Sequence, residues 1–322
     1  MKRNLIPILF CAALFPLLIW QSEGARSGAL AGAQLWAQIL LPSLLPYFAA
    51  AGLLQRLGLP ALIGRALAPA AARLFGVSGE AAAVFLLGLT GGYPLGAASA
   101  AELGRSGALT KEEGEHLLSF CDNTGPAFAV GALGAGVFGS ALTGFLLWLI
   151  HAGTAVLTGV LLSIGRPRAA AAYRAETPSA PNAFSEALTG SVKAAVTALL
   201  SIGGYVIFFS ALLGIADSFG MLNAAAKRLS RLSGVETAYF RALLGGMLEL
   251  SNGIGAMRAL PCTPLSLALG SFLLGWGGLC VHWQALAVTA DTHWNTKGRL
   301  GGKLLHGVLS AICTYILASL IL

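Results

Sequence analysis

Residues 79–101 read GEAAAVFLLGLTGGYPLGAASAA, an apolar stretch that the string Gly-Gly-Tyr-Pro (91–94) interrupts at its middle. A second apolar stretch, ETAYFRALLGGMLELSNGIGAM (236–257), is interrupted by Glu-Leu-Ser-Asn-Gly (249–253). Glycine weakens a helix and proline removes a backbone donor, so we expect helix on either side of each interruption and a break within it. Inside lipid, irregular backbone persists only where it is buried in protein or lines a wet cavity.

The composition of the 322-residue chain is that of a membrane protein. Hydrophobic residues make up 56% of it, charged residues only 10%, and the mean hydropathy is +0.77. Soluble domains carry about a quarter charged residues, and about 20 apolar residues cross a bilayer. We therefore expect an all-α, multi-pass protein of the cell (cytoplasmic) membrane, in contact with membrane lipid, with spans at about 29–55, 118–139, 141–164, 195–217, 264–288 and 304–322.

The first 25 residues allow two interpretations. Lys2 and Arg3 precede an apolar run from Leu5 to Trp20, as they do in a secretory signal peptide. The run is long for the apolar region of a signal peptide, and further apolar stretches follow it at once. We favour an uncleaved N-terminal transmembrane helix in residues 1–25.

The net charge of +7 raises the question of a nucleic-acid partner. The 20 lysines and arginines are scattered between the apolar stretches, and no basic face interleaved with aromatic residues is present. We therefore expect no nucleic-acid partner. Basic loops of this kind instead mark the cytoplasmic side of a membrane protein.

The two interrupted stretches belong to an internal repeat. A shift of 158 positions places Gly76-Val77 on Gly234-Val235 and Arg73-Leu74 on Arg231-Leu232, and a shift of 159 places Cys121 on Cys280. This pattern predicts a duplication. After the N-terminal helix, the chain divides into a first repeat (26–164), a linker (165–184) and a second repeat (185–322).

The basic residues also predict how the repeats are oriented. If 79–101 is a re-entrant helical hairpin, Arg56 and the basic residues from Arg166 to Arg174 face the cytoplasm, and the second repeat begins there. The two repeats are then inverted, as in many secondary transporters, and 236–257 is the second re-entrant hairpin. Two amphipathic stretches, 56–75 and 218–233, should lie along the membrane surface.

Polar residues at and after the breaks are the candidates for a solute site. Glu249 is the only acid between Ala242 and Leu260, and a carboxylate at membrane depth usually pairs, binds an ion or holds a substrate. The alternatives are a structural hydrogen bond or a pair with Arg258. The candidate substrate-binding residues are Gly91, Gly92, Tyr93, Asn123, Glu249, Ser251, Asn252, His282 and Gln284.

The chemistry of this set favours a neutral polar solute. It offers hydrogen-bond donors and acceptors without an excess of charge, which suits a nucleoside, and Tyr93 or Trp283 could stack on its ring. Asn123 and His282 occupy equivalent positions of the repeat and should approach each other.

Catalytic and metal-binding motifs have little support. The chain contains neither G-x-x-x-x-G-K-[ST] nor H-E-x-x-H, so we expect no ATP-driven transport, no enzyme activity and no cofactor. A metal site built from Cys121, Asp122, Cys280 and His282 lacks a local motif and is not expected.

Four strings carry a resemblance to a known family: Gly-Gly-Tyr-Pro-Leu-Gly (91–96), Phe-Cys-Asp-Asn (120–123), Leu-Glu-Leu-Ser-Asn-Gly (248–253) and Gly-Gly-Leu-Cys-Val-His-Trp-Gln (277–284). Over about residues 1–320 the chain resembles the YlbJ-type sporulation integral membrane proteins of the nucleoside-recognition (Gate-domain) group. The resemblance implies two Gate-like repeats whose hairpins hold a solute. By this resemblance, Glu249, Ser251 and Asn252 are the solute-binding residues of the second hairpin. Residues 91–94 take the corresponding place in the first hairpin, although they include no Glu or Gln.

The resemblance also implies a role in forming the spore cortex. The expected function is that of a sporulation-associated, transporter-like protein that binds or moves a small polar solute. The alternative is a non-transporting membrane scaffold, or morphogenetic protein, that keeps the fold. A wet polar pocket between the hairpins favours the first, and a dry midplane favours the second. Assembly into a homo-oligomer is compatible with either.

Overall fold

The computed structural model describes residues 5–166 and 183–321, and every regular element within them is a helix. The first half contains α1 (Leu5–Trp20), α2 (Ser22–Leu35), the π-helical η2 (Trp36–Leu40), α3 (Leu41–Arg56), α4 (Leu59–Leu74), α5 (Gly79–Gly91), α6 (Leu95–Arg105), α7 (Lys111–Leu117), the π-helical η3 (Ala127–Ala135), α8 (Gly136–Phe138) and α9 (Ala141–Leu162).

The second half follows a similar order. It contains α10 (Phe184–Ser218), α11 (Met221–Ser233), α12 (Thr237–Leu248), α13 (Leu250–Ala256), the short 3-10 helix η4 (Met257–Ala259), α14 (Pro264–Trp276), α15 (Gly278–Val288), the 3-10 helix η5 (Ala290–Thr292) and α16 (Lys297–Ile321). The all-α fold predicted from the composition is confirmed.

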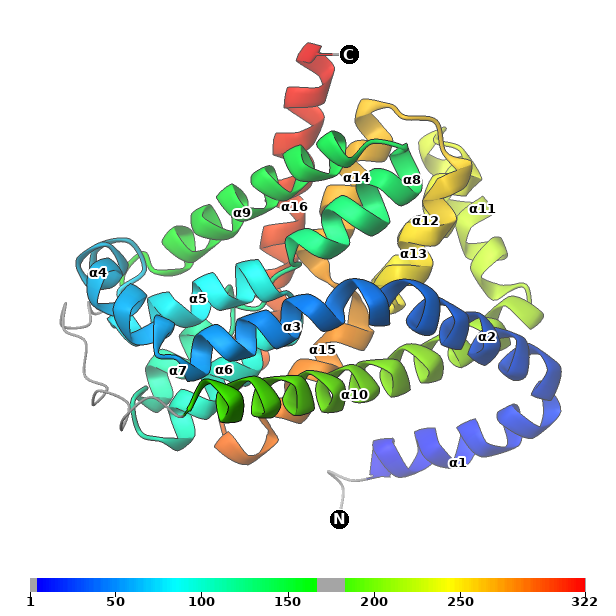
Figure 1. Cartoon of the computed structure of the whole chain (residues 1–322). Helices are drawn as coiled ribbons and strands as arrows, with labels where there is room; N and C mark the ends of the chain where they lie inside the picture. Colours follow the sequence, from blue (N-terminus) through cyan, green and yellow to red (C-terminus); the bar gives the residue numbers. More distant parts are fainter. Residues whose placement is uncertain (1–4, 167–182, 322) are drawn as a thin grey trace.

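Two long helices lie side by side across the molecule (Figure 1). The first is the continuous helix formed by α2, η2 and α3, and the second is α10; each has 35 residues. Small residues allow their close approach. A methyl group placed on Gly28 would lie 2.2 Å from the Ser210 carbonyl oxygen, and one on Gly214 would lie 2.2 Å from the Gly24 carbonyl oxygen. The helices are therefore packed backbone against backbone.

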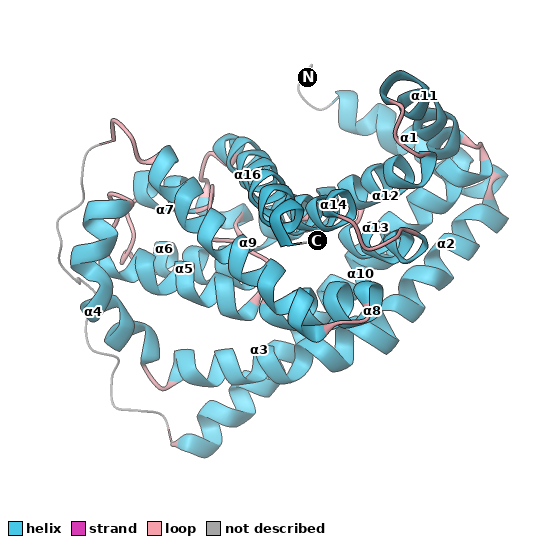
Figure 2. Cartoon of the chain, turned by 90° about the horizontal axis from the view of Figure 1, so that it is seen from above, coloured by secondary structure: helices cyan, strands magenta, loops and turns pink. Residues whose placement is uncertain are grey.

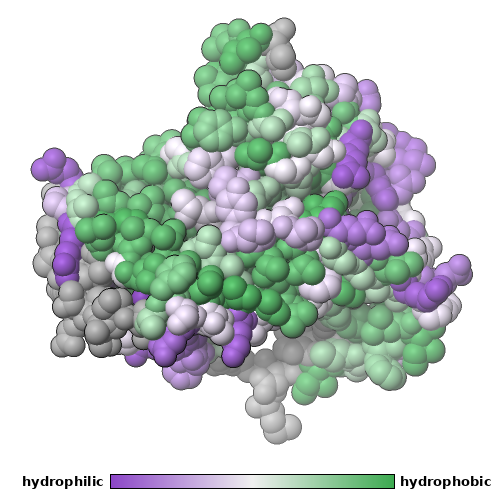
Figure 3. Space-filling view, in the orientation of Figure 1, coloured by the Kyte–Doolittle hydropathy of each residue, from purple (hydrophilic) through white to green (hydrophobic). Residues whose placement is uncertain are grey.

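Five of the described helices are long and apolar enough to cross a membrane: Ser22–Arg56, Ala141–Leu162, Phe184–Ser218, Pro264–Val288 and Lys297–Ile321. Apolar side chains cover much of the face seen in Figure 3, and polar ones gather near its margins. The expected multi-pass architecture is confirmed. The N-terminal helix α1 has 16 described residues, and most of the expected linker (167–182) lies outside the described residues.

One expected span is not a single helix. Residues 118–125 are non-helical, and the helix resumes only over η3 and α8. The physical reason is the string from Asp122 to Pro126, whose polar side chains bond to other elements and whose proline cannot continue a helix from the preceding residues.

Both interrupted stretches break where expected, and at both breaks the chain folds back. A methyl group on Gly96 would lie 2.4 Å from the Cys121 carbonyl oxygen, and Gly96 itself packs against Gly88 of the preceding helix. In the second stretch, a methyl group on Gly253 would lie 2.2 Å from the Cα of Gly246. Gly88 and Gly246 are separated by the repeat offset of 158 residues. The re-entrant and inverted arrangement in the membrane remains a prediction.

The amphipathic helices α4 and α11 lie at opposite ends of the molecule (Figure 2). The axis turns by 97° between Leu62–Leu74 and Gly79–Gly91. A helix inclined this strongly to its neighbour is compatible with the expected position of α4 along the membrane surface. The surface positions of α4 and α11 both remain predictions.

We predict that Gly28→Ala lowers the thermal stability of the purified protein. The added methyl group would force α2 away from α10, and overpacking of this kind typically costs about 1–3 kcal/mol. Gly204→Ala in α10 is the matched control, because among the described residues no atom beyond the backbone of its own helix lies within 4 Å of the added methyl group. Thermal unfolding in detergent checks this, and an equal Tm for both variants would contradict it.

We also predict that residues 105 and 258 lie on opposite sides of the membrane. Val288 is one end of the span Pro264–Val288, and Arg105 donates to its carbonyl oxygen at 2.9 Å. Arg258 lies six positions before Pro264, the other end of this span. Single cysteines replacing Arg105 and Arg258 should react with a membrane-impermeant thiol reagent from opposite faces. Labelling of both from one face would refute the inverted arrangement.

Candidate solute-binding site

The first helix break uses glycine where the backbone needs it. Helix α5 ends at Gly91, and Gly92 has a φ of 86°, which favours glycine. The Tyr93–Pro94 peptide bond is cis, and α6 begins at Leu95. The Tyr93 hydroxyl leaves its own hairpin and donates to the Leu274 carbonyl oxygen at 2.8 Å.

The second break is organised by Glu249. Its backbone is extended, and its carboxylate accepts from the backbone N–H groups of Ser251 (3.1 Å) and Asn252 (2.7 Å) at the start of α13. The Asn252 amide also donates to this carboxylate and to the Ser210 hydroxyl of α10, both at 2.7 Å. Of the alternatives, the structural hydrogen bond is present, whereas Arg258 donates to the Gly136 carbonyl oxygen.

A third break divides the span 264–288 and was not expected from the sequence. Helix α14 ends at Trp276, and both Gly277 and Gly278 have positive φ values of 84° and 81°. The turn leaves the Leu274 carbonyl oxygen outside the regular helix pattern, and the hydroxyls of Tyr93 and Thr124 donate to it at 2.8 and 2.9 Å. The sequence signal for this break was the Gly-Gly pair that begins the string 277–284, one of the four strings that carry the family resemblance.

The first and second breaks, the non-helical segment 118–125 and α15 border a small space, which we call the inner cavity. Its volume is about 50 Å³, room for one or two water molecules. Its polar lining comes from the first two breaks, from the non-helical segment before η3 and from α15, and its other walls are apolar. The lining residues from these four parts are Gly92, Tyr93, Thr124, Gly125, Glu249, Leu250, Ser251, Val281 and Gln284.

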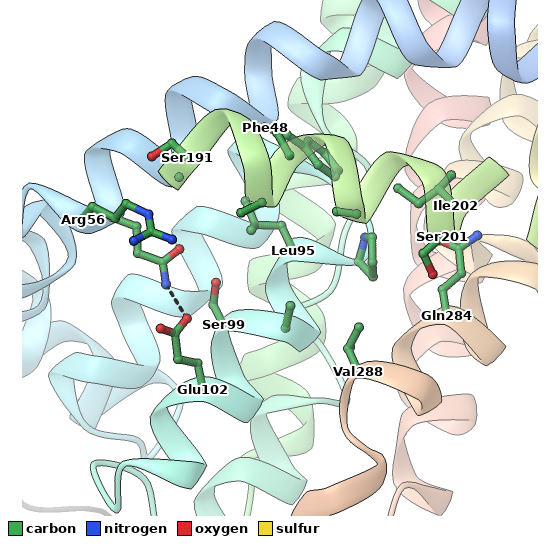
Figure 4. A pocket seen from close by; sticks show the side chains of 17 residues that line it. Phe48, Arg56, Leu95, Ser99, Glu102, Ser191, Ser201, Ile202, Gln284 and Val288 are labelled. Carbon is green, nitrogen blue, oxygen red and sulfur yellow. Dashed lines mark hydrogen bonds between the residues drawn. The ribbon is translucent and has the colours of Figure 1, made fainter. Parts of the chain in front are cut away.

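A larger space, the outer cavity, lies between α3, α6, α10 and α15 (Figure 4). Its volume is about 360 Å³. Figure 4 shows Arg56 and Glu102 at one end and Gln284 at the other; Glu102 accepts a hydrogen bond from Gln55 at 3.0 Å. Gln284 lines both cavities, so they adjoin along α15, with the outer cavity nearer to Val288.

The structure brings together five of the nine predicted site residues: Gly92, Tyr93, Glu249, Ser251 and Gln284 line the inner cavity. Gly91 ends α5 beside them, and Asn252 holds the Glu249 carboxylate. Asn123 and His282 lie elsewhere, in the buried charge cluster described next. Trp283, expected as a stacking partner, is 55% exposed and lines neither cavity.

A buried charge cluster adjoins Tyr93 and Thr124, two residues that also line the inner cavity. The Asp122 carboxylate accepts from the Arg299 guanidinium at 2.6 Å, and the two residues are 0% and 3% exposed. Asp122 also accepts from the Ala97 N–H in the first turn of α6 at 3.4 Å. The remaining Arg299 contact is with the His282 ring nitrogen Nδ1. We define the cluster as Asp122, Asn123, His151, His282, Arg299, Lys303 and His306.

Sequence reasoning missed the basic half of this cluster. The expected final span begins at residue 304 and leaves out Arg299 and Lys303. The structure continues α16 from Lys297 to Ile321. The available signal was the spacing of its buried polar residues by three or four positions, which puts them on one face of a helix: Arg299, Lys303, His306, Ser310 and Thr314.

The contacts of Asp122 and His282 also bear on the metal site considered above. Both contact the Arg299 guanidinium, a cation that competes with any metal ion for their lone pairs. Among the described residues, no group of three His, Cys, Asp or Glu side chains is arranged to hold a metal ion.

We predict that Asp122→Asn strongly destabilises the protein. It leaves the Arg299 charge buried without a carboxylate, and breaking such a pair typically costs about 3–5 kcal/mol. Asp291→Asn is the matched control: its pair with Arg105 is exposed and screened by water, so its loss should leave stability nearly unchanged. Thermal unfolding of both variants checks this, and equal stabilities would contradict a dominant role for the buried pair.

Comparison with known proteins agrees with the resemblance seen in the four strings. The chain is 28% identical to the sporulation integral membrane protein YlbJ of Bacillus subtilis (strain 168), over 343 aligned positions that cover 98% of this chain and 84% of the relative. No protein-family model matches the chain, and no solved structure matches it. The resemblance to YlbJ-type proteins is thus confirmed along nearly the whole chain, and the chain is a multi-pass membrane homologue of a sporulation integral membrane protein.

Proposed function

We propose that this chain binds a small polar solute in the outer cavity and passes it through the inner cavity during sporulation. The observation that carries the proposal is the junction of the two cavities at Gln284, with Glu249 at the inner end. Transporters commonly place their solute site between broken helices near the membrane midplane.

The sizes of the cavities assign them different roles. The outer cavity, at about 360 Å³, falls within the range of small-molecule sites, about 300–1,000 Å³. The inner cavity is too small for a nucleoside-sized molecule. A solute of that size would rest against Gln284 and advance only when the helix breaks move apart. This is the step that alternating access requires of a transporter.

The lining of the outer cavity supports a polar solute with both donors and acceptors. Ser99 is 3% exposed, and its hydroxyl has no hydrogen-bond partner within the described part of the chain. Glu102, Gln55 and Gln284 add carboxylate and amide groups. A buried hydroxyl facing a cavity is a natural partner for a polar ligand.

The scaffold alternative is favoured by one observation, the small volume of the inner cavity. A protein that has lost its transport cycle would tolerate changes in the outer cavity, provided that it still folds. A transporter would not.

We predict that Ser99→Phe and Gln284→Leu abolish function without loss of folded protein. The first fills the outer cavity, and the second removes the polar group at the junction. Within the described residues, the Gln284 amide donates a weak hydrogen bond to the Cys280 sulfur (3.3 Å). Val192→Phe, on an exposed position of α10 outside both cavities, is the control for added bulk.

The measurement is spore formation by a Bacillus subtilis strain that lacks YlbJ and expresses each variant, with the protein in the membrane quantified. We expect at least a tenfold fall in spore number for the two cavity variants and no change for Val192→Phe. Full spore formation by both cavity variants would favour the scaffold.

A further inference from the structure

We propose that Lys303 and His306 form a proton-binding site that couples solute movement to a proton; this rests on the proposed transport function. Ionisable side chains within membrane-spanning helices commonly mark ion pathways or proton relays. Both residues lie on the buried face of α16, and neither is exposed to solvent.

The surroundings of Lys303 are suited to either protonation state. Its Nζ lies 2.7 Å from the Asp122 carbonyl oxygen, 3.2 Å from Asn123 Oδ1 and 3.3 Å from His306 Nδ1. These three acceptors match the three N–H donors of an ammonium group, and each acceptor is an uncharged group. The Asp122 carboxylate is paired with Arg299 instead. The charges of Asp122 and Arg299 cancel, so with neutral histidine rings the net charge of the cluster is that of Lys303.

The hydrogen bonds of His306 assign its tautomer and leave one nitrogen free to accept a proton. Its Nε2 lies 3.0 Å from the His151 carbonyl oxygen, which can only accept, so Nε2 carries the hydrogen in the neutral ring. Nδ1 therefore presents a lone pair to Lys303. A proton can pass along this contact from Nζ to Nδ1, breaking one N–H bond as the other forms.

Other titratable groups face this pair from each element packed around it. The ring of His151 of α9 contacts that of His306, with centroids 4.4 Å apart and planes tilted by 36°, and Tyr93 lies at the first helix break. Helix α14, which packs along α16, contributes no titratable side chain. The remaining groups come from the segment before η3, from α15 and from α16 itself: Cys121, Asp122, His282 and Arg299.

Two residues connect the proton-binding site to the inner cavity. Tyr93 lines the cavity, and Lys303 Nζ lies 5.2 Å from the centroid of its ring. Thr124 also lines the cavity, and its backbone N–H donates to His151 Nε2 at 3.1 Å. A solute that displaces either residue changes the surroundings of the pair. By thermodynamic linkage, if proton binding changes the affinity for the solute by some factor, solute binding changes the affinity for the proton by the same factor.

The first test counts protons without any solute. Purified protein in nanodiscs is titrated from pH 9 to pH 5, and the number of protons taken up is compared between variants. Lys303→Met and Lys303→Arg should each take up about one proton fewer than the wild type, because methionine binds none and arginine stays charged throughout. An unchanged count in both variants would overturn the proposal.

His116→Gln is the matched control for removing a buried basic group outside the cluster. Burial and, secondarily, the neighbouring Arg166 lower the pKa of His116 to about 4, so it stays mostly neutral over this window. The count for His116→Gln should therefore equal that of the wild type. Thermal unfolding of every variant verifies that it is folded, and Lys303→Arg keeps the charge if Lys303→Met fails to fold.

The second test measures uptake of labelled uridine and adenosine into proteoliposomes with and without an imposed pH gradient. The gradient should stimulate uptake by the wild type, and Lys303→Arg should lose at least tenfold of that stimulation while retaining solute binding within about twofold. Uptake that ignores the gradient in the wild type would overturn the coupling and leave the proposed function intact. Absence of any uptake would count against these solutes, and the proton count would still decide the role of Lys303.

Discussion

Backbone groups released at a helix break must find partners inside the protein, because lipid offers none. In this molecule the breaks satisfy one another. The Leu274 carbonyl oxygen of the third break accepts from Tyr93 of the first, and the Met247 carbonyl oxygen beside the second accepts from Trp276 of the third. The breaks thus form one interlocked unit, and the inner cavity lies beside the first two of them, where the backbone cannot close into a regular helix.

The same constraint explains where the charges lie. Asp122 lies in the non-helical segment 118–125, and its carboxylate accepts from the first turn of α6 as well as from Arg299. Lys303 Nζ donates to the Asp122 carbonyl oxygen, a group that the irregular segment leaves without a helical partner. Buried polar groups are tolerated when they are hydrogen-bonded, so the cluster on α16 and the irregular backbone before η3 stabilise each other. Function, as proposed, uses groups that the fold already requires.

Local signals predicted the elements better than their partners. Gly-Gly-Tyr-Pro and the Glu249 string predicted two breaks correctly, because glycine, proline and an isolated acid act on the backbone beside them. The break at Gly277 and the cluster around Lys303 were missed. A hydropathy reading treats two glycines in an apolar run as helix and a lysine at its edge as loop. The hydrogen bonds that reverse these two interpretations join residues 150 and 180 positions apart. Asn123 and His282 were predicted as site residues at equivalent positions of the repeat, but only the tertiary structure separates them from the cavity wall.

The two 35-residue helices have a consequence for the surrounding bilayer. At about 1.5 Å per residue each is about 52 Å long, well beyond the roughly 30 Å of hydrocarbon that a membrane offers. Helices with such a hydrophobic mismatch tilt, or carry their ends into the headgroup region. Because α3 and α10 form two walls of the outer cavity, their inclination also sets how far those walls stand apart. A thicker or thinner bilayer should therefore change access to the cavity, which makes the lipid composition of the host membrane a determinant of what the protein can admit.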